Sequence, residues 1–76
     1  MTTMIDIVRL LKQKGYNCIW NGACNIEFLD NYNFHTIPKG FIFKDNNLIQ
    51  VTDIKLKKEK QIKRDTKVLE KWVKSL

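Results

Sequence analysis

The chain has 76 residues, of which 14 are Lys or Arg and 8 are Asp or Glu, so its net charge is +6 at pH 7. A folded chain of this size buries only about 60% of the surface that the unfolded chain exposes, which is too little for a second hydrophobic core. The length therefore excludes a multidomain enzyme and a large internal substrate cavity.

The positive charge is concentrated in the last third of the chain. Residues 53–76 contain nine Lys or Arg and four acidic residues. Residues 1–52 contain five Lys or Arg and four acidic residues. Such a block is either a solvated face or a surface that attracts a polyanion, first of all the phosphates of nucleic acid and then an acidic protein. Twelve of the basic residues are Lys, a bias that fits the AT-rich genome of a bacteriophage or a low-GC bacterium.

The predicted compartment follows from patterns that the sequence lacks. It has no charged leader followed by an apolar stretch, no apolar run near 18 residues, and only two cysteines. We therefore expect a cytoplasmic protein, in the host cytoplasm if the source is viral, with reduced thiols and no membrane partner.

The first predicted element is a helix over residues 4–14. Thr2 and Thr3 are suitable N-caps, and Gly15 stands where a helix C-cap favours a positive φ. The apolar residues recur three or four positions apart, as one buried helical face requires. They are Met4, Ile7, Val8 and Leu11.

Four strands are predicted to follow, because short runs rich in aromatic and β-branched residues alternate with turn formers. We expect them over residues 16–20, 24–29, 40–44 and 48–52, the last extending through Leu56. Residues 30–40 form a loop, and residues 45–47 are the connection of a second antiparallel hairpin.

The first hairpin contains Asn21-Gly22, a dipeptide typical of two-residue turns. In that register Ile19 lies opposite Cys24, and Cys18 points to the other side of the ribbon, so no disulfide forms. A three-residue loop would instead pair the two cysteines, so the prediction depends on the turn.

The last predicted element is a helix over residues 64–75. In one helix over residues 54–76, Asp65 would point into the apolar face. In a helix that begins between residues 62 and 66, Asp65 lies in the first turn, beside the positive end of the helix dipole. Glu70 and Lys74 then form a favourable i, i+4 pair. The apolar face consists of Leu69, Trp72, Val73 and Leu76.

The complete order, α-β-β-β-β-α, predicts a single small α+β domain over residues 1–76, with helices packed on a mainly antiparallel sheet. Opposite its apolar face, the last helix and the connection before it carry the predicted nucleic-acid-binding residues. Lysine contacts to phosphate supply affinity without reading base sequence. These residues are Lys57, Lys58, Lys60, Lys63, Arg64, Lys67, Lys71 and Lys74.

Residues 7–16 (IVRLLKQKGY) and 38–55 (PKGFIFKDNNLIQVTDIK) resemble the archaeal Holliday-junction resolvases and the wider PD-(D/E)XK nucleases. In those enzymes a helix ending in Lys-Gly-aromatic precedes a proline-aspartate strand, a tight turn and a strand with acidic-x-lysine. The resemblance implies that Asp53 helps to bind Mg²⁺ and that Lys55 orients the attacking water. Two acidic positions of the pattern are missing, because Lys39 and Met4 occupy them. Asp45 and Glu27 are the available replacements.

The remaining candidates carry weaker patterns. Cys18, Cys24 and His35 lack the close ligand pairs of a zinc site and form no recognisable Cys-His nucleophile. Tyr16, Trp20 and Trp72 have rings that could stack on bases, although aromatic residues of a small domain more often form its core. No glycine-rich phosphate loop is present.

The residues leave three functions open. The favoured one is a small nucleic-acid-binding protein with a reduced nuclease-like core, without strong catalysis and without a cofactor. The second is a phage-type inhibitor or adaptor that binds an acidic host protein. The third is an active Mg²⁺-dependent structure-specific endonuclease, working as a homodimer because 76 residues offer little surface for a branched substrate.

Overall fold

A computed structural model of the protein describes residues 2–51 and 59–76, with side chains for residues 2–51 and 66–76. The elements are, in chain order, α1 (Met4–Gln13), β1 (Cys18–Trp20), β2 (Ile26–Phe28), β3 (Phe41–Lys44), β4 (Asn47–Gln50) and α3 (Glu59–Ser75). All strand pairs are antiparallel. The predicted α+β domain, with the order α-β-β-β-β-α, is confirmed.

The predicted helix is confirmed as α1, with Thr3 as its N-cap and Gly15 directly after its C-cap residue Lys14. At its start Thr3 and Asp6 form a capping box. The amide of Asp6 donates to the Thr3 hydroxyl at 3.3 Å, and the amide of Thr3 donates to the Asp6 carboxylate at 3.0 Å. These bonds satisfy N–H groups that the start of a helix otherwise leaves without partners. At the other end Gly15 has a φ of +98°, which glycine adopts without steric cost.

The capping box makes the stability of the fold depend on pH. The backbone and side-chain hydrogen bonds from Thr3 lower the pKa of the Asp6 carboxyl below its ordinary value of 3.8, and Arg9 lowers it further. The resulting stabilisation is fully present above the unfolded-state pKa and is lost as the pH falls through the lower folded-state pKa. We expect the free energy of unfolding of Asp6→Asn to fall less than that of the wild type between about pH 5 and about pH 2 in urea titrations. Parallel pH profiles would contradict this assignment.

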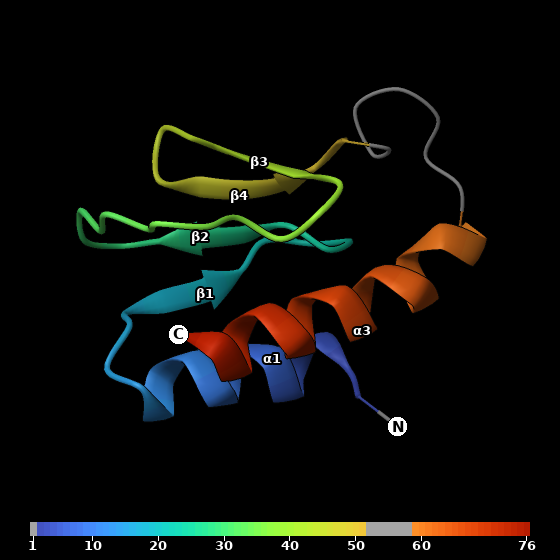
Figure 1. Ribbon diagram of the computed structural model, residues 1–76, viewed down its shortest axis with the longest axis horizontal. Coiled ribbons are helices and arrows are strands. Elements are labelled where there is room, and N and C mark those ends of the chain that lie inside the picture. Colours follow the sequence, from blue (N-terminus) through green and yellow to red (C-terminus); the bar gives the residue numbers. More distant parts are fainter. Residues whose placement is uncertain (1, 52–58) are drawn as a thin grey trace.

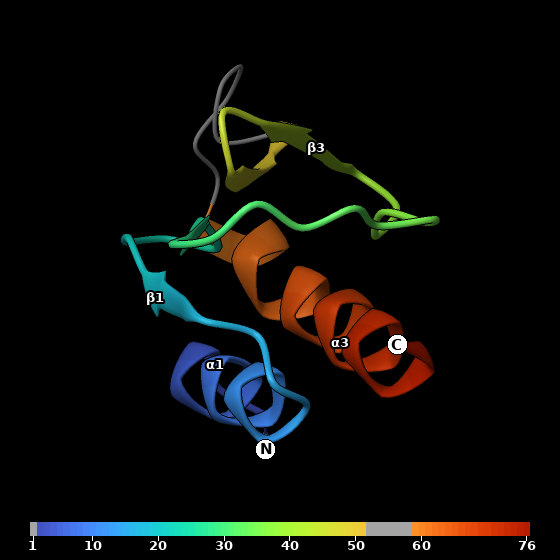
Figure 2. The same cartoon turned by 90° about the vertical axis from the view of Figure 1, so that its left-hand side faces the viewer.

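The sheet has the strand order β1-β2-β4-β3, and both helices lie against the same face of it (Figures 1 and 2). The side chains on that face are buried and form the core with the helices. The strands contribute Cys18, Ile26, Phe28, Phe41 and Leu48. No helix in the described part of the chain is both long and apolar enough to cross a membrane.

The predicted register of the first hairpin is wrong. Cys18 lies opposite Phe28 and Trp20 opposite Ile26, so five residues connect the strands instead of two or three. A two-residue turn of this type needs a positive φ at both central residues. Here the positive φ values fall one position later, at Gly22 (+92°) and Ala23 (+48°). Both cysteines are buried, and no disulfide joins them.

The second hairpin is confirmed, with a shorter turn than predicted. Asp45 and Asn46 have φ values of +52° and +62°, the geometry of a two-residue turn, and Lys44 lies opposite Asn47. The outgoing strand β4 ends at Gln50, before the predicted end of the strand at residue 52. Its predicted extension through Leu56 lies outside the described residues.

The last helix begins earlier than predicted, at Glu59 and not between residues 62 and 66. The residues that precede the expected start are mostly Glu, Lys and Gln, which are strong helix formers and extend the helix toward its N-terminus. Asp65 is therefore an interior position of α3, and the predicted role of Asp65 in the first turn is wrong.

Aromatic rings join the sheet, the loop of residues 30–40 and α3. Figure 2 shows this loop passing between β3 and α3. The ring of Phe34 lies 5.3 Å from that of Phe43 on β3 and 5.1 Å from that of Trp72 on α3. The indole N–H of Trp72 donates to the carbonyl of Thr36 at 2.8 Å. The loop is thus part of the core, and it fixes α3 under the sheet.

Candidate nucleic-acid interface

The C-terminal half of α3 separates buried from charged side chains. Lys67, Lys71 and Lys74 are exposed. Their spacing of four and three residues places them in one stripe along the helix. We call these three residues the lysine face. The core side of the same segment consists of Thr66, Leu69, Trp72 and Val73. The predicted division of this helix into an apolar and a basic side is confirmed for the described side chains.

Two lysines of this face are available for an external anion. The ammonium of Lys74 lies 3.5 Å from the carboxylate of Glu70, which confirms the predicted i, i+4 pair. That carboxylate also accepts a hydrogen bond from the hydroxyl of Thr2 at 2.8 Å. Lys67 and Lys71, in contrast, form no ion pair with any described residue. Their charges are therefore the least compensated among the described side chains of α3.

The other predicted binding residues are only partly described. The helix α3, which runs from Glu59 to Ser75, includes Lys60, Lys63 and Arg64, of which only the backbone is described. The remaining candidates lie outside the described residues. They are Asp53, Lys55, Lys57 and Lys58.

The helices α1 and α3 lie side by side and run in the same direction (Figure 1). Contacts near both ends of α1 hold this arrangement. Thr2 donates to Glu70, and the ammonium of Lys14 donates to the carbonyl oxygen of Leu76 at 3.0 Å. The two helices therefore belong to one surface of the molecule. We call this surface the helix layer and define it by residues 2–16 and 66–76.

The described charges divide unequally between the helix layer and the remainder of the molecule. The helix layer has six cations and two carboxylates, a net charge of +4: Arg9, Lys12, Lys14, Lys67, Lys71 and Lys74 against Asp6 and Glu70. Residues 17–51 have two cations and three carboxylates, a net charge of −1: Lys39 and Lys44 against Glu27, Asp30 and Asp45. The fold thus adds cations of α1, which are distant in the sequence, to the basic C-terminal segment.

Described residues outside this layer supply little that could perform catalysis. Burial raises the pKa of the Cys18 thiol and outweighs the opposite effect of Lys12, so this thiol is protonated at neutral pH and is a poor nucleophile. His35 is exposed, on the loop before β3. In residues 2–51 and 66–76, no three His, Cys, Asp or Glu side chains gather where they could hold a metal ion. The replacement carboxylates Glu27 and Asp45 lie on β2 and in the β3–β4 turn.

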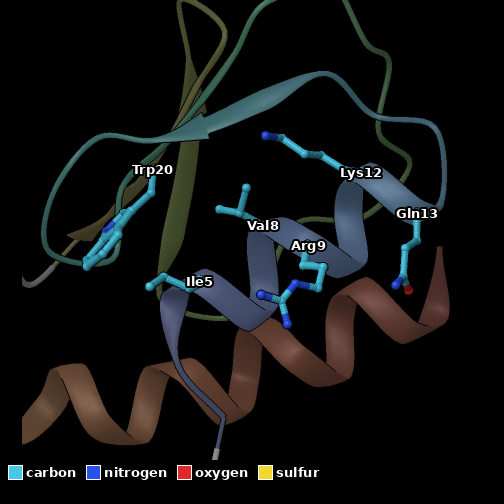
Figure 3. Close-up of a pocket in the computed structure, with 6 residues that line it drawn as sticks. All are labelled: Ile5, Val8, Arg9, Lys12, Gln13 and Trp20. Atoms are coloured by element: carbon cyan, nitrogen blue, oxygen red, sulfur yellow. The ribbon is translucent and has the colours of Figure 1, made fainter.

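The sequence did not reveal one further feature, a groove at the edge of the helix layer, between α1 and the end of β1. Its volume is about 460 Å³, and Trp20 forms one side of it (Figure 3). Trp20 is 47% exposed, whereas Trp72 is 6% exposed. Tyr16 is half-buried and packs against the core. The expectation that aromatic residues form the core therefore holds for Tyr16 and Trp72 and is wrong for Trp20, which ends an edge strand.

Comparisons with known proteins add no assignment to these observations. No protein-family model, no curated protein and no solved structure matches the chain.

Proposed function

We propose that this protein binds nucleic acid through the helix layer, with the lysine face of α3 contacting the phosphate backbone. The observation that carries the proposal is the segregation of charge, with net +4 on the helix layer and net −1 on residues 17–51. A polyanion is attracted to one side of such a molecule and is not attracted to the other.

The form of the lysine face supports contact with a regular array of phosphates. From Lys67 to Lys74 the helix rises by about 10 Å, and a DNA duplex carries one negative charge per about 1.7 Å of its axis. A duplex that lies along α3 thus offers several phosphates within reach of the three side chains. Lysine presents a flexible point charge and reads no base edge, so we expect affinity without a preference for base sequence.

The experiment is a fluorescence anisotropy titration at low salt. Labelled duplex DNA, single-stranded DNA and RNA are compared with a labelled polyglutamate of matched charge. We expect the wild type to bind the nucleic acids and to release them as salt is added. Absence of binding to all nucleic-acid probes would contradict the proposal. Tighter binding of polyglutamate than of every nucleic acid would favour the second candidate, an inhibitor or adaptor that engages an acidic protein.

The reduced nuclease-like core remains a separate part of the proposal, because Asp53 and Lys55 lie outside the described residues. One carboxylate seldom holds Mg²⁺, which prefers octahedral oxygen ligands, and Lys39 places a positive charge where the resembled enzymes have an aspartate. We therefore propose nucleic-acid binding without strong cleavage. Incubation of a branched and a duplex substrate with Mg²⁺ should leave both intact. Metal-dependent nicking that disappears in Asp53→Asn would instead establish that the protein is a metal-dependent endonuclease.

A further inference from the structure

The groove between α1 and β1 combines an apolar end with a cationic end. Figure 3 shows Trp20 and Ile5 together at one end, with Val8 between them and the polar residues. Farther along α1, Lys12 extends toward β1, and Arg9 and Gln13 project from the same helix. A ligand that fits this arrangement has an apolar group and an adjacent negative charge.

The indole of Trp20 is held in place before any ligand arrives. Its N–H donates to the carbonyl of Ala23 at 2.7 Å, within the five-residue β1–β2 connection. The polar atom of the ring is therefore already satisfied, and the part of the side chain that stays exposed is apolar. Side-chain ordering on binding costs free energy, so an aromatic ring that is already ordered binds a flat partner at a smaller cost. Ile5, which is 57% exposed, extends this apolar surface.

The cations of the groove suit a phosphate. The guanidinium of Arg9, whose side chain is 67% exposed, lies 4.0 Å from one carboxylate oxygen of Asp6. The other oxygen of that carboxylate accepts two hydrogen bonds from Thr3. The planar set of donors of the guanidinium matches phosphate oxygens in a way that a point charge does not. Lys12 is exposed on the next turn and adds a second positive charge.

We propose that this groove binds an unpaired nucleotide, with the base stacked on Trp20 and the neighbouring phosphates on Arg9 and Lys12. This inference rests on the proposed function and adds to it a site for an unpaired base, in single-stranded nucleic acid or in an unpaired segment. In a duplex each base face is covered by its neighbours, so only an unpaired base can cover the indole. The volume of the groove, about 460 Å³, lies within the usual range of about 300–1,000 Å³ for small-ligand sites. An acidic peptide would match the cations but offers no flat group for the ring.

The two tryptophans make the proposal testable by fluorescence. Trp20 is exposed in the groove, and Trp72 is buried with its N–H bonded to Thr36. We expect a dodecamer of thymidylate to quench the emission of the wild type and to leave that of Trp20→Phe, which retains only Trp72, unchanged. A 12-base-pair duplex should bind without quenching.

Affinity measurements with matched variants complete the test. Stacking on one base contributes about 1–3 kcal/mol, so Trp20→Ala should weaken thymidylate binding by about five- to 150-fold and leave duplex binding unchanged. Ile5→Glu should weaken thymidylate binding by a similar factor, and it is expected to fold because an acidic residue in the first turn of α1 is favourable. The control Ile37→Glu has the same charge change on an exposed loop residue outside the groove, and its affinities should equal those of the wild type.

Three results would overturn the proposal. If both probes bind and Trp20→Ala has the thymidylate affinity of the wild type, nucleotide binding in the groove is refuted and the proposed function is not. Quenching of Trp20 by a glutamate dodecamer at lower concentration than by thymidylate assigns the groove to an acidic protein segment. Failure of the wild type to bind either nucleic acid refutes this inference together with the proposed function.

Discussion

Replacing Phe28 by Ala is expected to remove a large part of the stability of the fold. Phe28 is 2% exposed, and its ring lies 5.2 Å from that of Phe34 and 5.7 Å from those of Tyr32 and Phe43. Deleting a buried Phe side chain costs about 3–5 kcal/mol. A chain of this length has a total stability of roughly 4–11 kcal/mol, at about 0.05–0.15 kcal/mol per residue. The loss therefore takes between about a quarter and all of the available stability.

The neighbouring residue supplies the control for this prediction. Leu29 follows Phe28 directly and is 48% exposed, so Leu29→Ala removes a large apolar side chain at nearly the same point in the chain. We expect its effect to stay within about 0.5 kcal/mol, as for most surface substitutions. Urea unfolding followed by circular dichroism measures both values. Equal losses of unfolding free energy in the two variants would show that the aromatic rings around Phe28 are not the centre of the core.

The second large effect concerns binding and uses two variants of equal net charge. In Lys67→Gln/Lys71→Gln, the two uncompensated cations of the lysine face are removed. Glutamine and lysine have similar helix propensities, so we expect α3 to remain folded. At about 0.1 M salt each lost phosphate contact weakens duplex binding roughly eightfold, which amounts to about sixty-fold for two. Anisotropy titrations with a labelled duplex measure this loss.

The matched control is Lys39→Gln/Lys44→Gln. Both lysines are exposed and belong to residues 17–51, the part of the molecule with a net charge of −1. This variant loses the same two positive charges away from the helix layer. We expect its affinity to fall much less, because only long-range attraction is reduced. Equal losses in both variants would mean that total charge, and not the lysine face, determines binding.

Local chemistry explains which elements could be predicted from the sequence. The start of α1 depends on Thr3 and Asp6, three residues apart, and the second hairpin turn on Asp45 and Asn46, so neighbouring residues contain the required information. The first hairpin turn depends also on distant contacts. In that turn the side-chain oxygen of Asn25 accepts a hydrogen bond from the backbone amide of Gln50 at 3.3 Å. No local sequence pattern indicates that contact.

The candidate site shows the same distinction. Periodicity along α3 was enough to predict that Lys67 and Lys71 lie opposite the apolar face, because both sides belong to one helix. The addition of Arg9 and Lys12 to the same surface depends on how α1 packs beside α3, which involves residues more than 60 positions apart. The exposure of Trp20 depends on the end of an edge strand whose register the sequence did not determine.

The salt dependence of duplex binding tests most directly whether the lysine face contacts phosphates. Association constants are measured for the wild type and Lys67→Gln/Lys71→Gln over a series of salt concentrations and plotted on logarithmic axes. Each phosphate contact contributes about 0.9 to the magnitude of the slope for duplex DNA, so we expect the slope of the variant to be smaller by about 1.8. Lines of equal slope for the two proteins would contradict the account, because they would show that Lys67 and Lys71 release no counterions from the nucleic acid.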